Sequence, residues 1–263
     1  MSQAVARGLA GIECMSGVPG LVGATPIQNV GAYGQEVSDT IVSVRAFDRE
    51  SSSVVQLSKQ DCRFAYRSSW FKAGARGRFL ILGVTYQLDT AGRPNVGYRD
   101  LALALEAAGI SKPTLADVRA AVLEVRRSKS MLLDPADPDA RSCGSFFMNP
   151  LVTSADLEQV RARAGMDDLP SYPQSDGRVK LSAAWLIERA GFRKGERLGS
   201  AAISSRHSLA LVCRSDCRAS DVVALARRIR SEVQRAFGVH LFPEPEFWGF
   251  ASVDAGLPDE RLA

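Results

Sequence analysis

The chain has 263 residues, of which 46% are hydrophobic and 24% are charged, and its formal net charge is +4. This balance is typical of a soluble globular protein with one large or two ordinary domains. So mild a positive charge argues against a dedicated nucleic-acid-binding protein and suits a small anionic ligand such as a nucleotide. No apolar run is long enough to span a bilayer, and residues 1–14 have too short an apolar core for a secretory signal. We therefore expect a cytoplasmic protein without a membrane partner.

Residues 16–36, SGVPGLVGATPIQNVGAYGQE, contain five glycines, and their apolar residues follow neither a helical nor a strand period. Closely spaced glycines allow backbone N–H groups to turn toward one point, an arrangement that holds a pyrophosphate or lies against a flat ring. The stretch matches neither GxGxxG nor GxxxxGK[ST]. On these residues alone, a structural loop is about equally compatible with the sequence.

The next part of the chain predicts a sheet with antiparallel pairs. Residues 40–47 and 54–57 read as strands around a polar turn, and residues 79–88 read as a longer strand. A helix should then run from Thr114 to about Arg127, because Thr114 and Asp117 form a capping box. Its apolar face consists of Leu115, Val118, Val122 and Val125.

A second helix is predicted from Ser220 to Phe237, ending at Gly238. Its inward face consists of Val222, Leu225, Ile229, Val233 and Phe237, and its outward, solvated face contains Arg227, Arg228 and Arg235. The Asp- and Pro-rich residues 127–142 read as a loop near a domain boundary. The predicted fold class is α+β. The predicted parts are residues 1–95, residues 96–250 and a tail at residues 251–263.

The five cysteines are odd in number, and no two form a CxxC pair, which favours reduced thiols over a disulfide framework. They are Cys14, Cys62, Cys143, Cys213 and Cys217. Cys213, Cys217 and His207 lack a fourth ligand, so no metal site is predicted. Ser145, His207 and an aspartate could be imagined as a hydrolase triad, but the GxSxG motif is absent.

Six motifs occur in one order along the chain. They are residues 16–36, YRSSWFK at 66–72, VGYRDL at 96–101, CGSFFMNP at 143–150, HSLALV at 207–212 and FGVHLFPEPE at 237–246. Together they closely resemble the UDP-N-acetylenolpyruvoylglucosamine reductase family, from about Gly8 to Gly249. The family begins with a further flavin-binding domain, and this chain starts just after the position of that domain. The resemblance therefore makes residues 1–95 the C-terminal part of an FAD-binding region and residues 96–250 the substrate-binding domain.

The resemblance implies an FAD- and NADPH-dependent oxidoreductase of peptidoglycan synthesis, and therefore of cell-wall biogenesis, cell shape and cell division. NADPH reduces FAD, and a hydride then passes to the outer carbon of an enolpyruvyl double bond on a UDP-sugar. Negative charge develops on the carbon beside the carboxylate, which calls for cationic and acidic groups and a proton donor. We expect a monomer.

The resemblance assigns the catalytic positions to Arg67, Ser145 and Glu244. The family usually has Asp where this chain has Ser68, so the support of Arg67 is expected to differ here. Glu246 is the rival of Glu244, and the spacing to Gly249 favours Glu244. A solvated arginine, a capping serine and surface carboxylates are the ordinary structural alternatives.

The resemblance also implies cofactor and substrate contacts. Cofactor-binding positions are Ser16, Gly17, Pro19, Gly20, Gly23, Gln28, Asn29, Gly31, Ala32 and Tyr33. Substrate-binding positions are Tyr98, Lys129, Asn149 and Lys180. The alternatives are a half-buried aromatic for Tyr98, a solvated helix end for Lys129 and a turn residue for Asn149.

Two other functions stay open at this point. The chain could be a truncated, non-catalytic fragment that binds a UDP-sugar but not FAD. A flavin oxidase of hydroxy acids is less favoured, because the GSFFMNP and PEPE motifs are those expected for enolpyruvyl reduction.

Overall fold

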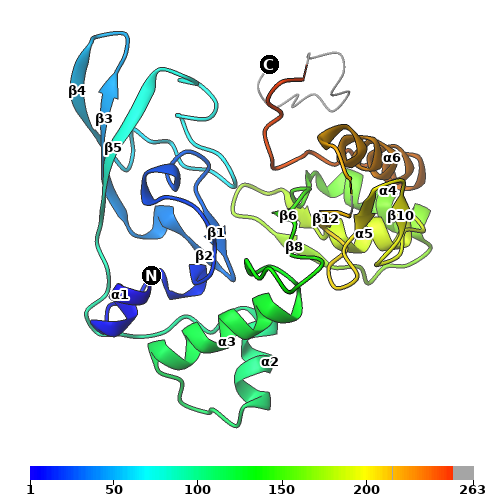
Figure 1. Cartoon of the computed structure of the whole chain (residues 1–263), viewed down its shortest axis with the longest axis horizontal. Helices are drawn as coiled ribbons and strands as arrows, with labels where there is room; N and C mark the ends of the chain where they lie inside the picture. Colours follow the sequence, from blue (N-terminus) through cyan, green and yellow to red (C-terminus); the bar gives the residue numbers. More distant parts are fainter. Residues whose placement is uncertain (215, 251–263) are drawn as a thin grey trace. The chain divides into compact units, whose positions relative to one another are not determined.

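The structure is a computed structural model that describes residues 1–214 and 216–250. The chain divides into two compact units, Met1–Ser128 and the residues from Lys129 onward (Figure 1). The predicted tail at residues 251–263 lies outside the described residues. Among the described residues, no helix has both the length and the apolar composition that a membrane span requires.

The first unit contains a three-stranded antiparallel sheet in the order β4-β3-β5. Its strands are β3 (Ile41–Asp48), β4 (Ser53–Ser58) and β5 (Phe79–Tyr86). In this register Phe47 lies opposite Val54 on one side and Leu80 on the other. Ile41 and Val44 face a buried cluster that also contains Met15 and Phe71. The three predicted strands and their antiparallel pairing are therefore confirmed, with small shifts at their ends.

Short elements precede this sheet. They are α1 (Ser2–Ala6), the 3-10 helices η1 (Glu13–Met15), η2 (Val22–Ala24) and η3 (Val37–Asp39), and the two-residue strands β1 (Gly31–Ala32) and β2 (Gln35–Glu36). Strands β1 and β2 pair antiparallel, with Tyr33 and Gly34 between them. Both of these residues have positive φ, 49° and 81°, which is the backbone that a tight two-residue hairpin requires.

Helices α2 (Arg99–Ala107) and α3 (Leu115–Ser128) complete the first unit. The predicted capping box of α3 is confirmed, because Thr114 N–H and hydroxyl donate to Asp117 and Asp117 N–H donates back to Thr114 Oγ1. Leu101, Val118 and Val122 are buried in one cluster with Cys14. This packing joins α2 and α3 to the N-terminal unit. The compact units therefore divide after Ser128, within the loop at residues 127–142 that is predicted to lie near a domain boundary, and not at residues 95 and 96. Which ligand each unit binds stays a prediction.

The second unit has two small antiparallel sheets. One has the strand order β10-β11-β12-β6 and the other the order β7-β9-β8. The strands of the first are β6 (Ser142–Ser145), β10 (Arg197–Leu198), β11 (Ala201–Ile203) and β12 (Ala210–Cys213). Those of the second are β7 (Leu151–Val152), β8 (Ser171–Pro173) and β9 (Val179–Leu181). The helices are α4 (Ser154–Ala164), α5 (Ala183–Arg189) and α6 (Ala219–Phe237).

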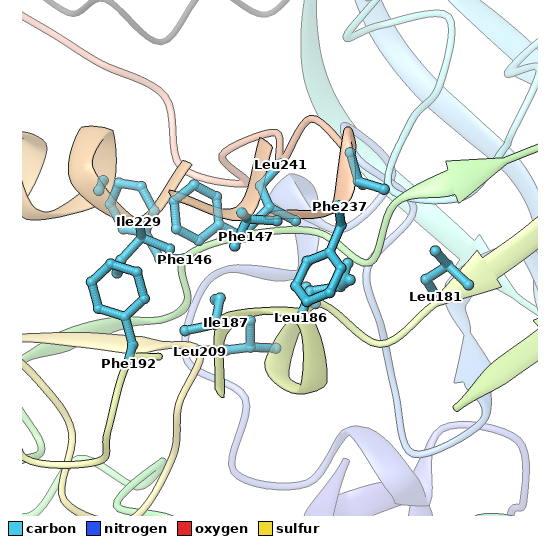
Figure 2. Packing of buried hydrophobic residues seen from close by; sticks show 14 of the residues in the cluster. Phe146, Phe147, Leu181, Leu186, Ile187, Phe192, Leu209, Ile229, Phe237 and Leu241 are labelled. Atoms are coloured by element: carbon cyan, nitrogen blue, oxygen red, sulfur yellow. The ribbon is translucent and has the colours of Figure 1, made fainter. Parts of the chain in front are cut away.

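The core of the second unit joins both sheets to these helices (Figure 2). Leu225, Ile229, Val233 and Phe237 of α6 are buried as predicted, whereas the predicted Val222 is only half-buried. The predicted N-cap, Ser220, is wrong by two positions: α6 is capped at Arg218, whose N–H donates to Asp221 Oδ2 at 2.9 Å. The helix ends at left-handed Gly238 as predicted. With helices and antiparallel sheets in both units, the α+β class is confirmed.

Candidate active site

The glycine-rich stretch begins with open backbone. Gly17 and Gly20 have φ of 77° and 126°, and both are exposed. In the described part of the chain, no acceptor is recorded for the N–H groups of Gly17, Gly20 and Leu21. Leu21 and Val22 are 79% and 62% exposed. Left-handed glycines with available N–H groups beside apolar surface fit the phosphates and the flat ring of a nucleotide cofactor.

Two predicted cofactor residues in this stretch have side chains that bind the protein itself. Ser16 is 1% exposed, and its hydroxyl donates to the Glu13 carbonyl at 2.7 Å. Asn29 is equally buried, and its Nδ2 donates to Glu36 Oε2 at 2.7 Å and to the Ala65 carbonyl at 3.1 Å. Its Oδ1 accepts from Ser38 N–H. These two side chains shape the loop, and any contact with a cofactor would use their backbone.

The β1–β2 hairpin packs tightly against the segment that contains Arg67. Arg67 Nη2 donates to the Gly31 carbonyl at 2.7 Å. A Cβ on Gly31 would lie 2.7 Å from the Gln35 carbonyl oxygen and 3.0 Å from Arg67 Nη1. Glycine is therefore required at position 31 by lack of space, and not by a left-handed backbone.

The Arg67 segment is itself a tight turn. Ala65 and Ser68 exchange both backbone hydrogen bonds, and Arg67 has a φ of 52°. Its guanidinium stacks on the Tyr66 ring at 5.2 Å. Arg67 Nη1 lies 4.0 Å from Glu36 Oε1, and the two side chains are 18% and 35% exposed. This half-buried, oriented guanidinium differs from the solvated arginine that the residue type alone would suggest.

Lys72 and Gln28 belong to the same region of the first unit. Lys72 is 7% exposed, and its ammonium group lies 3.4 Å from both Gln28 Oε1 and the Arg67 carbonyl. Residues of the 16–36 stretch and of the YRSSWFK motif therefore form one polar cluster, although more than thirty residues separate them in sequence.

Tyr98, a predicted substrate residue, is also in the first unit. It is 41% exposed, and its ring packs edge-on against Tyr33 with centroids 5.3 Å apart. The fully buried Glu13 fixes the chain just before it, since Glu13 Oε1 accepts from Asn95 N–H at 2.9 Å. Tyr98 is thus half of a tyrosine pair at the start of α2, with much of its ring in solvent.

The second unit brings Ser145 and Glu244 onto adjoining segments. Glu244 N–H donates to the carbonyl of Phe146, the residue after Ser145, at 2.8 Å. Phe147 and Pro243 form an antiparallel bridge next to it. Desolvation raises the pKa of the Cys143 thiol of β6, and the charge of Glu244 raises it further. Glu244 is half-buried whereas Glu246 is exposed, which favours Glu244 as the reactive carboxylate.

The two phenylalanines after Ser145 anchor it to the core. Phe146 and Phe147 are 3% and 1% exposed, and their rings meet at 5.1 Å (Figure 2). Ser145 lies at the end of β6 and pairs with Ala210 of β12. Its hydroxyl has no recorded hydrogen bond within the described residues, so it is available to a ligand.

The predicted substrate residues of the second unit have different local roles. Asn149 Oδ1 accepts from Ala183 N–H at 3.0 Å and so helps to cap α5, while its amide nitrogen has no recorded partner in the described chain. Lys180 lies in β9, opposite Leu151 and Tyr172. Lys129 is the half-buried first residue of the second unit, directly after α3.

The loop between Lys129 and Ser145 is fastened by a buried carboxylate. Asp139 is 2% exposed, and its Oδ2 accepts from Ser204 Oγ, Ser205 N–H and Ser205 Oγ at 2.6–2.9 Å. Its Oδ1 lies 2.5 Å from Arg214 Nη2. No sequence motif singled out Asp139 or Glu36 as a site residue. A signal was present for Glu36, since it is the one charged residue of the 16–36 stretch.

No group of three or more histidine, cysteine or carboxylate residues suited to a metal ion occurs among the described residues. All five cysteines are free thiols. Burial raises the pKa of Cys14 to about 12 and that of Cys62 to about 11. Protonated thiols of this kind are packing residues rather than nucleophiles.

Of the three predicted catalytic residues, Arg67 belongs to the first unit, and Ser145 and Glu244 belong to the second. Within the units, the structure joins Arg67 to the glycine-rich stretch and Ser145 to the Glu244 segment.

Comparison with known proteins agrees with this division. Residues 135–248 match the family model described as "UDP-N-acetylenolpyruvoylglucosamine reductase, C-terminal domain". A UDP-N-acetylenolpyruvoylglucosamine reductase of Thermobifida fusca is 48% identical over 256 residues, which cover 95% of this chain and 71% of that relative. One from Salinispora arenicola is also 48% identical, over 250 residues that cover 93% of this chain and 68% of the relative.

A solved structure supports the fold. The UDP-N-acetylenolpyruvylglucosamine reductase of Thermus caldophilus aligns with a TM-score of 0.59 and 24% identity, covering 94% of this chain and 67% of that one. At this identity the likeness establishes the arrangement of the chain and not its chemistry.

Proposed function

We propose, because this chain belongs to the UDP-N-acetylenolpyruvoylglucosamine reductase family, that it reduces the enolpyruvyl group of UDP-N-acetylglucosamine enolpyruvate to UDP-N-acetylmuramate in peptidoglycan synthesis. The observation that carries this proposal is the coincidence of motif and geometry. Arg67, Ser145 and Glu244 lie on segments held by hydrogen bonds or strand pairing, in a chain that is 48% identical to named reductases.

The chemical barrier is the negative charge that develops beside the substrate carboxylate. A guanidinium can offer two parallel N–H donors to such a carboxylate. The Arg67 guanidinium is positioned by its hydrogen bond to the Gly31 carbonyl and by the Tyr66 ring. The half-buried Glu244 is proposed to complete the electrostatic environment of the developing charge. Because the contacts with Gly31 and Tyr66 orient the Arg67 guanidinium before the reaction, little reorganisation of that group is needed when the charge forms.

Ser145 is proposed as the proton donor. A serine hydroxyl is a weak acid, so it can donate only to a strongly basic carbanion held close to it. The two buried phenylalanines that follow it limit the access of water, and the Ser145 hydroxyl is not committed to another acceptor in the described structure. The proton is therefore delivered to the carbon beside the carboxylate.

FAD, reduced by NADPH, would supply the hydride for the outer carbon. The residues proposed to hold FAD are those of the 16–36 stretch, chiefly through the open backbone around Gly17 and Gly20. Tyr98, Lys129, Lys180 and the amide of Asn149 are proposed to bind the diphosphate and uridine. The protein is proposed to act in the cytoplasm as a monomer and to contribute to cell-wall growth, cell shape and division.

One experiment tests the proposal as a whole. The purified protein is given FAD, NADPH and UDP-N-acetylglucosamine enolpyruvate in deuterated water, and the product is analysed by NMR. We expect deuterium at the carbon beside the carboxylate and the NADPH-derived hydrogen on the outer carbon. Binding of the UDP-sugar without NADPH oxidation would instead favour the alternative of a binding fragment. If the protein neither binds the UDP-sugar nor oxidises NADPH, the proposed function is refuted.

A further inference from the structure

We infer that Glu36 is a positioning residue that orients the Arg67 guanidinium for the substrate carboxylate. The inference rests on the proposed function, since it assigns Glu36 a part in the same reaction. It concerns contacts within the first unit alone, where the carboxylate is placed between Asn29 and Arg67.

The position of Arg67 begins with its backbone. The turn from Ala65 to Ser68 and the left-handed φ of Arg67 direct the chain back on itself at this residue. The Tyr66 ring supports one face of the guanidinium, and the Gly31 carbonyl accepts from Nη2. These contacts support one face of the guanidinium and one of its terminal nitrogens, Nη2.

Glu36 lies opposite the other terminal nitrogen of the guanidinium, Nη1. Its Oε2 accepts from Asn29 Nδ2 at 2.7 Å, and Asn29 is itself fixed by Ala65 and Ser38. Its Oε1 faces Arg67 Nη1 at 4.0 Å. Because that separation is longer than a hydrogen bond, the carboxylate attracts the guanidinium electrostatically without accepting a hydrogen bond from Nη1.

The partial exposure of Arg67 and Glu36 means that their attraction can orient the guanidinium but adds little to the stability of the fold. With side chains 18% and 35% exposed, the attraction is partly screened by water and contributes little to folding. An outer partner that fixes a reactive side chain nonetheless affects the rate, since a misdirected guanidinium meets the developing charge at the wrong angle. An added Cβ on Gly31 would lie 2.8 Å from Glu36 Cγ, so the hairpin has room for the glutamate in this place because position 31 is glycine.

A double-mutant cycle of Glu36→Gln and Arg67→Lys tests the inference in the protein expressed from its native gene. Glutamine keeps the Asn29 contact and removes the charge. We expect Glu36→Gln to lower kcat about 10-fold while KM for the UDP-sugar changes less than about 3-fold. The double variant should be no slower than Arg67→Lys alone, because Glu36 acts through Arg67. The rate of flavin reduction by NADPH and the melting temperature should stay near those of the unmodified protein.

Glu50→Gln is the matched control, since Glu50 forms an ion pair with Arg78 at 2.7 Å elsewhere in the first unit. It should leave turnover unchanged. Glu36→Asp, which keeps the charge with a shorter reach, should lose less turnover than Glu36→Gln, and this comparison decides the matter if the glutamine variant folds poorly. The inference would be overturned if the losses of kcat in the two single variants multiplied in the double variant. It would also be overturned if Glu36→Asp and Glu36→Gln lost turnover equally. Near-normal turnover of Arg67→Lys would instead contradict the role of Arg67 in the proposed function.

Discussion

Replacement of Asp139 by alanine should destabilise the second unit strongly. The carboxylate is 2% exposed, accepts three hydrogen bonds from Ser204 and Ser205, and pairs with Arg214. Alanine would leave the buried Ser204 hydroxyl and the two donors of the more exposed Ser205 without this acceptor, and Arg214 without its partner. Removal of one member of a buried pair typically costs about 3–5 kcal/mol. Because Arg214 is 24% exposed and can reach water, we expect a loss near the lower end, about 3 kcal/mol.

The assay is urea unfolding followed by tryptophan fluorescence. Trp70 is first replaced by phenylalanine, so that the remaining tryptophans, Trp185 and Trp248, report on the second unit. Asp134→Ala is the control, because this exposed aspartate in the same loop accepts only a local bond from Ala136 N–H. The control should lose less than about 1 kcal/mol. An Asp139→Ala variant as stable as the control would refute the view that this carboxylate fastens the loop between Lys129 and Ser145.

Three further predictions concern the reaction and its setting. Ser145→Ala should leave flavin reduction by NADPH nearly intact and slow reduction of the enolpyruvyl sugar by about 10³-fold. Stopped-flow kinetics of the two half-reactions would measure this, and equal slowing of both would exclude a proton-donor role. Gly31→Ala should lower kcat at least about 10-fold through the displaced Arg67, whereas Gly83→Ala, where a Cβ meets nothing within 4 Å, should not. The unfolding free energy should fall as pH drops below about 4. Hydrogen bonds from Thr114 and Thr153 lower the pKa values of Asp117 and Asp156 in the folded state. The two carboxylates therefore stabilise the fold above their unfolded pKa, and this stabilisation is lost as pH falls through their folded pKa values. An unfolding free energy that does not change from pH 7 to 3 would contradict this.

The helices were predictable because their signals are local. Thr114 and Asp117 lie three residues apart and form the predicted box, and the apolar period of residues 115–125 matches the buried face of α3. For α6 the sequence predicted most of the buried face and the C-terminal Gly238 correctly, but the predicted start was wrong. The cap is completed by Arg218 N–H, which donates to Asp221, and not by the Ser220 side chain. An aspartate three residues into a helix is as strong a signal as a serine at its start.

The contacts of the site were not predictable in this way. The strands β1 and β2 have two residues each, too few to show a period, and their turn uses Tyr33 at a φ that favours glycine or asparagine. Arg67 meets Gly31 across 36 residues of sequence, and Asp139 meets Ser204 across 65. Residue type and motif identified Arg67 as a candidate, but only folding shows which backbone carbonyl and which carboxylate orient it.

The glycine-rich stretch illustrates why composition alone could not decide between a ligand loop and a structural loop. Gly20 has a φ of 126°, and a Cβ there would meet nothing within 4 Å, so glycine at this position serves an unusual backbone beside open space. Gly31 has no such φ, and a Cβ there would collide with the hairpin and with Arg67. The first half of the stretch is thus suited to receive a ligand, and the second half is packed protein that orients a side chain. The packed role is observed at Gly31, whereas the ligand role of Gly17 and Gly20 stays a prediction. The distinction between them follows from space and dihedral angle, neither of which glycine content records.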